Sequence, residues 1–207
     1  MSRRILINTY RIDDSERASF LNLARGAQNE QPHFEDFGFQ VYAHPDEHDF
    51  FAEIILLPDP AVAGTKTAME AYHFASSYQP ERDSCIKIGT RLISFRGTYG
   101  DDAGIIPLDS AAIRYTPLRS NEENREALAA SMNLLKQNRE HQVQIISLSS
   151  AEFEDTYGLL EFFSTVGDFQ RAEGAEPTDN DIIDAVKAVT DSTIDRNDLP
   201  STFVRFR

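Results

Sequence analysis

Residues 37–58 read FGFQVYAHPDEHDFFAEIILLP and hold two apolar stretches on either side of a charged segment. In the first stretch, apolar residues occupy every second position at Phe37, Phe39 and Val41, which is the period of a half-buried strand. The second stretch, Phe50 to Leu57, is a more continuous apolar run that ends before a proline. Two such runs joined by a short polar segment indicate a β-hairpin.

Apolar residues at helical spacing, each group preceded by capping residues, predict five helices around this hairpin. The first helix follows Asp13 to Ser15 and ends at Gly26, and the second follows Thr67 and covers about 68–78. The third follows Ser120 and covers about 121–140. The fourth follows Ser149 and runs through Phe163, and the fifth follows Thr178 and runs through Val189. Further strands are expected at 5–12, 105–115, 143–148 and 203–207, and one or two strands at 85–100. The segment GDFQRAEGAEPTD at 167–179 is interpreted as an acidic loop.

The strands expected before residue 118 come in hairpin-like pairs without a helix between each pair, which argues against a strictly alternating, doubly wound sheet. The sequence therefore predicts an α+β fold with a mainly antiparallel or mixed sheet and about five helices packed on it. The length of 207 residues predicts a single domain over 1–207. Residues 150–207 would be the acidic, mostly helical C-terminal region of that domain.

The charge of the chain restricts its partners. The formal net charge is −14, and residues 151–200 hold 13 Asp and Glu against 3 Lys and Arg, a local balance of −10. Such a field repels phosphate, so no direct nucleic-acid contact is expected, and a basic protein is the favoured partner. The predicted partner-binding residues on the last helix are Asp179, Asp181, Asp184 and Asp191. The alternative is that the acidity serves solubility alone.

The cysteine count and hydropathy indicate where the protein works. Cys85 is the only cysteine, so the chain can form neither an internal disulfide nor a cysteine-based zinc site. No apolar run approaches the roughly 20 residues that span a bilayer, and no signal peptide is recognised at the start. We therefore expect a cytoplasmic protein that contacts no membrane, free or incorporated into a particle.

The segment HPDEHD at 44–49 contains the inverted zinc-protease pattern, with His44, Glu47 and His48 at the spacing H-x-x-E-H. On a helix, two histidines four residues apart face one metal ion and the glutamate can act as a base. Pro45 and the two flanking strands leave no room for that helix. The segment is therefore interpreted as a charged hairpin tip, and no metal ligand is predicted.

The segment FRGT at 95–98 resembles the first motif of arginine-type ADP-ribosyltransferases and also a segment of class 3 lipases. The first resemblance implies that Arg96 would hold a dinucleotide. No G-x-S-x-G motif follows for a lipase nucleophile. The residues themselves indicate an arginine at the end of a strand followed by a turn at Gly97.

A third motif, AGTKT at 63–67, has the strand and helix order of a phosphate loop, but Asp59 stands where its first glycine would be. We therefore predict no catalytic, cofactor-binding or metal-binding residue and no cofactor.

The leading hypothesis is a non-enzymatic structural or interaction protein, a subunit of a larger oligomer or hetero-assembly, for which a viral or phage particle is one setting. The first alternative is an acidic inhibitor or immunity-type protein that binds a basic partner. The second is an enzyme that uses Arg96 or the cluster of His44, Glu47 and His48.

Overall fold

The chain folds into two units. The first consists of Met1–Asp101 together with Phe203–Arg207, and the second of Asp102–Thr202. The computed structural model describes residues 3–32, 37–58, 64–90, 93–99, 106–119, 144–150, 156–174 and 201–205. The predicted helix over about 121–140, the helix after Thr178 and the four aspartates assigned to partner binding lie outside these residues. Those assignments stay predictions.

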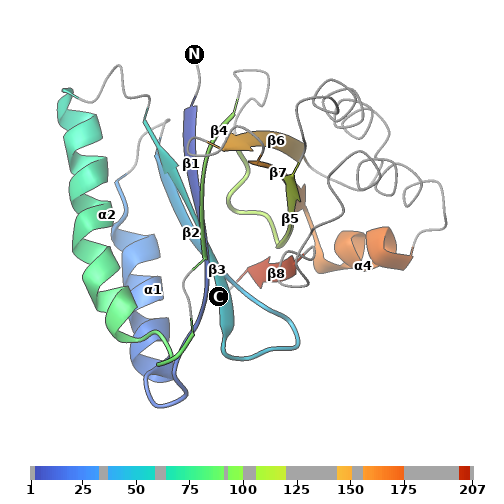
Figure 1. Cartoon of the computed structure of the whole chain (residues 1–207), viewed down its shortest axis with the longest axis horizontal. Helices are drawn as coiled ribbons and strands as arrows, with labels where there is room; N and C mark the ends of the chain where they lie inside the picture. The colour runs from blue at the N-terminus through green and yellow to red at the C-terminus, as the bar shows by residue number, and fades with distance from the viewer. Residues whose placement is uncertain are drawn as a thin grey trace. The chain divides into compact units, whose positions relative to one another are not determined.

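The first unit has the element order βαββαβ. Its elements are β1 (Arg3–Arg11), α1 (Arg17–Glu30), β2 (Gly38–Ala43), β3 (Phe50–Leu57), α2 (Lys66–Ser84) and β4 (Ile93–Tyr99). The strands pair antiparallel in the order β4, β1, β3, β2, and β8 (Ser201–Arg205) adds to β2 through Tyr42 and Ala43. This order is the ferredoxin-like arrangement. Both helices lie on the same face of the sheet (Figure 1).

The hairpin of β2 and β3 is confirmed, with Phe39 opposite Ile55 and Val41 opposite Glu53. Between this sheet face and the helices lies an aromatic core. The rings of Phe20 and Phe51 are 4.8 Å apart, as are those of Phe39 and Tyr78. Alternation placed every second side chain of the hairpin on the helix-facing side, which is why the sequence predicted it.

Both helices of the first unit extend past the residues predicted to end them. Helix α1 continues through Gly26 to Glu30, and α2 begins after Thr65 and runs through Pro80 to Ser84. Proline removes one backbone donor and usually ends or kinks a helix. Here the turn beyond Pro80 is held by Arg82, whose side chain is buried against the sheet. The prediction that α2 ends before Pro80 is therefore wrong.

The second unit contains β5 (Ala112–Arg119), β6 (Gln144–Ser150), β7 (Thr156–Phe163) and α4 (Val166–Gly174). Strand β7 pairs antiparallel with β5 on one side and β6 on the other. The predicted helix through Phe163 is therefore wrong, since these residues form β7. A central strand is buried on both faces, and its nearly continuous apolar run also satisfies a helical period, which is why the sequence indicated a helix.

The expected loop at 167–179 is also wrong at its start, where α4 forms. Thr165 Oγ1 accepts the Asp168 N–H at 3.0 Å, and Asp168 Oδ2 accepts the Thr165 N–H at 3.1 Å. This is a capping box, and its T-x-x-D spacing was readable in the sequence.

The predicted fold class, about five helices packed on one sheet, is wrong. The described residues form three helices, of which α1 and α2 pack on the sheet of the first unit and α4 belongs to the second. Within the same residues, no helix has the length and apolar composition that crossing a bilayer requires.

Candidate functional site

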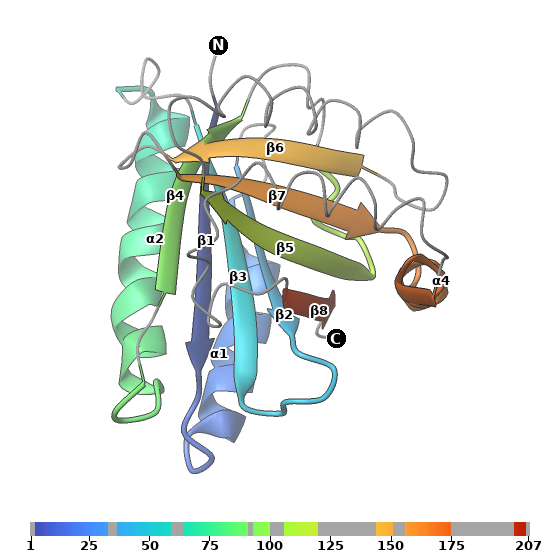
Figure 2. The ribbon, with the colours of Figure 1, turned by 45° about the vertical axis from the view of Figure 1, so that its right-hand side comes forward.

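A row of polar side chains crosses the helix-facing side of the first sheet. The strand register places Ser94 of β4 opposite Asn8 of β1, and Asn8 opposite Glu53 of β3. These three strands lie side by side in Figure 2. Glu53 is the single charged residue in the apolar strand FFAEIILL and is fully buried. A charge at such a position requires partners.

Glu53 has three partners. Arg82 Nη1 donates to Glu53 Oε1 at 2.6 Å, Asn8 Nδ2 donates to the same oxygen at 2.7 Å, and Tyr10 OH donates to Oε2 at 3.2 Å. The Arg82 guanidinium also lies over the Tyr10 ring, 5.5 Å from its centroid. The carboxylate on β3 is thus tied to one neighbouring strand, β1, and to helix α2.

Arg82 has a second carboxylate partner at the surface of the site. Its Nε and Nη2 donate to Asp83 Oδ1 at 3.0 and 2.8 Å. The Arg82 side chain is 4% exposed, whereas that of Asp83 is 55% exposed. The guanidinium therefore connects the buried Glu53 to a carboxylate at the solvent boundary.

Burial dominates the acid–base properties of this network. Burial raises the pKa of the Glu53 carboxyl, while the Arg82 charge opposes that rise. Burial also raises the pKa of Tyr10 and Tyr78, and the nearby Glu53 adds to both shifts. For Arg82, burial is the largest single influence and lowers the pKa, but Glu53, Asp83 and Tyr10 together outweigh it and the net direction is upward. Both tyrosines therefore keep their protons near neutral pH, and Tyr10 acts as a donor to Glu53.

Asn8 and Ser94 carry the network to a pocket in the same unit. Ser94 Oγ donates to Asn8 Oδ1 at 2.7 Å. The pocket has a volume of about 520 Å³, within the usual range for small-molecule sites. Its lining residues are Leu6, Asn8, Gln79, Arg82, Asp83, Ile86, Lys87, Ile88, Gly89, Thr90, Ser94 and Arg96.

A tight turn at Lys87–Thr90 forms one rim of the pocket. The Thr90 N–H donates to the Lys87 carbonyl at 3.1 Å, and Gly89 has φ of 84°, the value required at the third position of a type II turn. Ile88 is 96% exposed at this rim. A large apolar side chain at the edge of a pocket offers contact area to an apolar group that binds there.

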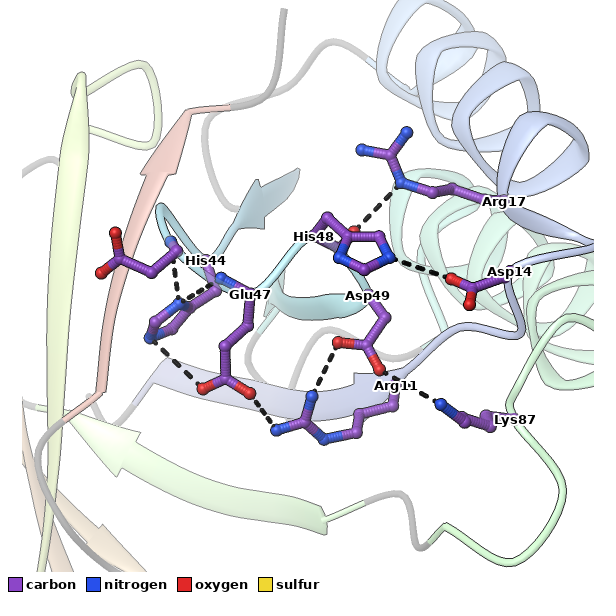
Figure 3. Close-up of polar contacts among 9 residues, drawn as sticks. Arg11, Asp14, Arg17, His44, Glu47, His48, Asp49 and Lys87 are labelled. Atoms are coloured by element: carbon purple, nitrogen blue, oxygen red, sulfur yellow. Dashed lines mark hydrogen bonds and ion pairs between the residues drawn. The ribbon is translucent and has the colours of Figure 1, made fainter.

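The histidine segment lies in the turn between β2 and β3 (Figure 3), and its residues 44–49 are not among those that line the pocket. His44 Nδ1 accepts the N–H groups of Asp46 and Glu47 at 3.2 and 3.1 Å. His48 Nε2 is 3.0 Å from Asp14 Oδ1, near the start of α1. The two rings thus have different partners, because the segment is a turn and not the helix that H-x-x-E-H requires.

The charged side chains of this turn are tied to Arg11 of β1 and to Lys87 of the Lys87–Thr90 turn. Arg11 contacts Glu47 and donates from Nη1 to Asp49 Oδ1 at 2.7 Å, and Lys87 Nζ is 3.6 Å from Asp49 Oδ2. The hydrogen bond that Arg11 donates to Glu47 is the largest influence that raises the Arg11 pKa. Within the described residues, no cluster of three His, Cys, Asp or Glu side chains is placed to hold a metal ion.

Arg96 lies within β4, opposite Leu6, and its neighbour Gly97 is opposite Ile5. The interpretation of Gly97 as a turn after the strand is therefore wrong. Arg96 lines the pocket. Glu53, Arg82 and Asn8 were not among the residues predicted to form a site. The signal for Glu53 was present, since one carboxylate stands inside an apolar strand, but the partner that neutralises it lies 29 residues away.

Three solved structures share the fold along 99% of the chain. Provisionally assigned monooxygenases from Lactobacillus acidophilus NCFM and Fusobacterium nucleatum subsp. nucleatum both give a TM-score of 0.66, at 10% and 12% identity and over 94% and 91% of their own chains. An anthrone oxidase-like protein gives 0.65 at 9% identity, over 92% of its chain. No protein-family model and no curated sequence matches the chain.

The class defined by these similarities is a fold that occurs in provisionally assigned monooxygenases and in an anthrone oxidase-like protein. This finding contradicts the prediction of a non-enzymatic structural or interaction protein, and with it the assembly-subunit, viral and inhibitor readings. The sequence predicted otherwise because its net charge can be counted directly, whereas the fold and the polar network depend on pairing between distant strands.

Proposed function

We propose that this protein is an oxidoreductase that oxidises a small organic substrate with molecular oxygen. The observation that carries the proposal is the fold, which matches two provisionally assigned monooxygenases at a TM-score of 0.66 and an anthrone oxidase-like protein at 0.65 over 99% of the chain. Because one fold can host several chemistries, the proposal also needs a place for a small molecule. The pocket of about 520 Å³ in the first unit provides one of suitable size.

The substrate class follows from the chemistry of oxygen. An organic molecule that is to reduce oxygen directly must readily become an electron-rich anion, as anthrones and hydroquinones do by losing a proton. Cationic side chains favour such an anion over its neutral form. Lys87 and Arg96 of the pocket lining are charges of the required sign. We therefore propose an acidic aromatic substrate.

Anthrone is a suitable first probe because its oxidation is balanced without a further reductant. Its methylene group loses two hydrogens, one oxygen atom of O₂ becomes the new carbonyl of anthraquinone, and the other leaves as water with those two hydrogens. Oxygen uptake and anthraquinone absorbance should rise together in a one-to-one ratio.

The test measures oxygen consumption with anthrone and with a set of hydroquinones, using purified full-length protein. The reference is the spontaneous oxidation rate with no protein and with heat-denatured protein. We expect an initial rate at least tenfold above both references for one member of the set. Rates equal to the references for every member would overturn the proposal. An absorption spectrum of the purified protein, recorded first, shows whether a coloured cofactor accompanies the activity.

The cytoplasmic location expected from the single cysteine is kept as part of this proposal.

A further inference from the structure

We propose that the pocket formed by α2, β1, β4 and the Lys87–Thr90 turn binds a small amphipathic organic anion, with its acid group at the cationic side chains and its apolar part on Ile88. This inference deepens the proposed function, on which it rests for the choice of an acidic aromatic ligand, by assigning the residues that would hold each part of that ligand. Its test measures binding, so it can fail or succeed separately from the oxidation.

The polar wall of the pocket is fixed before any ligand arrives. Asn8 and Arg82 are 1% and 3% exposed, and both donate to the fully buried Glu53. Asn8 in turn accepts from Ser94 at 2.7 Å. Side chains already held by hydrogen bonds lose little freedom on binding, so such a wall lowers the entropic cost of ligand capture.

The charge of the lining selects an anion. Among the residues that line the pocket, Arg82, Lys87 and Arg96 are cationic and Asp83 is the carboxylate. Arg82 is shared between Asp83 and Glu53. Lys87 is 3.6 Å from Asp49 and its side chain is 44% exposed, and an ammonium group has three donors. A positive lining in a chain with a net charge of −14 attracts anions to this place.

The apolar part of the lining determines the rest of the ligand. Leu6, Ile86 and Ile88 line the same pocket as the cations. Ile88 is 96% exposed, so the free protein leaves its side chain in water. A ligand with an aromatic or aliphatic body would cover that surface, whereas a simple inorganic anion would not. The combination favours an aromatic carboxylate or phenolate over phosphate.

The test uses 1-naphthoate as the probe and isothermal titration calorimetry on the full-length protein. Two analogues separate the contributions: 1-naphthalenemethanol retains the rings without the charge, and acetate retains the charge without the rings. We expect naphthoate to bind at least tenfold more tightly than either analogue. Raising the salt concentration from about 50 to about 500 mM should weaken naphthoate binding, because screening shortens to about 4 Å.

Two variants place the probe in this pocket. Lys87→Met should weaken naphthoate binding about tenfold and leave 1-naphthalenemethanol unaffected, while Ile88→Ser should weaken binding of both ring compounds. Lys66→Met is the matched control, since Lys66 is 91% exposed and lies outside the lining. It should bind naphthoate as the wild type does.

Equal affinity for the acid and the alcohol, or wild-type affinity in Lys87→Met, would overturn the proposal, and so would absence of naphthoate binding. The oxygen assay with naphthoate added then separates two sources of the ligand. Competitive inhibition identifies the pocket as the substrate site, whereas binding without inhibition identifies a separate effector site. Both results support binding, and binding remains measurable if no oxidation is found.

Discussion

Arg82, in the helical turn beyond Pro80, donates from Nη1 to Oε1 of Glu53 at 2.6 Å, and the two side chains are 4% and 0% exposed. This ion pair joins α2 to the centre of the sheet. A buried pair of this kind gives little net stability compared with apolar residues, but losing one partner leaves an uncompensated charge in the core. The pair therefore fixes where the end of α2 and the pocket wall lie.

The first prediction concerns this ion pair. Arg82→Met should lower the free energy of unfolding by about 3–5 kcal/mol, because Glu53 is left buried without its cation. The double variant Arg82→Met, Glu53→Leu should recover most of that loss. Urea denaturation of the wild type, both single variants and the double variant measures the cycle. Additive losses in the double variant would show that the pair is not coupled.

The second prediction is a pH dependence that Glu53 imposes on stability. Burial raises the pKa of this carboxyl in the folded protein, whereas glutamate in the unfolded chain titrates near about 4.3. Between these two pKa values the folded state binds a proton at Glu53 that the unfolded state has released. The stability that this proton contributes is fully present below about pH 4.3 and is lost as the pH rises through the raised pKa.

Glu53→Gln removes this titration. We expect the wild type to lose stability relative to Glu53→Gln when the pH is raised from about 4.5 to about 7.5. Unfolding free energies of both proteins at four pH values in that window provide the measurement. A difference that stays constant, or one that changes in the opposite direction, would contradict the raised pKa.

The third prediction compares two glycine-to-alanine substitutions that differ only in backbone conformation. A Cβ built on Gly89 or on Gly26 meets no atom within 4 Å, so neither change causes a clash. Gly89 has φ of 84°, and alanine there should cost about 1–2 kcal/mol. Gly26 lies within α1, and alanine there should add about 0.5–1 kcal/mol. Thermal unfolding of both variants measures the contrast. Stabilisation by Gly89→Ala would rule out the left-handed turn.

The fourth prediction separates the two histidines of the β2–β3 turn. His44 accepts two backbone N–H groups, so His44→Ala should lower stability by about 1 kcal/mol. His48 and Asp14 form a pair in which both side chains are 69% exposed, and His48→Ala should change stability little. Added zinc should leave the melting temperature of the wild type unchanged. A zinc-dependent rise that either variant abolishes would show that the rings bind metal together.

The sequence by itself determined the features that depend on neighbouring residues. Alternating apolar residues at Phe37, Phe39 and Val41 predicted a strand and its hairpin partner, because the two faces of a strand differ at every second residue. Capping residues near Ser15 and Thr67 predicted the two helices of the first unit to within a few residues of their starts. Pro45 correctly indicated that His44 and His48 do not share a helix, since proline restricts the local backbone.

Only the tertiary structure decided the features that depend on residues far apart in the chain. The sequence of β7 predicts a helix because a strand buried on both faces lacks the alternation of apolar and polar residues that identifies a strand. Its pairing with β5 and β6 decides that it is a strand. Helix α2 passes Pro80 because Glu53 binds Arg82 beyond it. The polar wall of the pocket depends on the register that places Ser94 opposite Asn8. These two residues are 86 positions apart in the chain, so no local sequence pattern indicates their hydrogen bond.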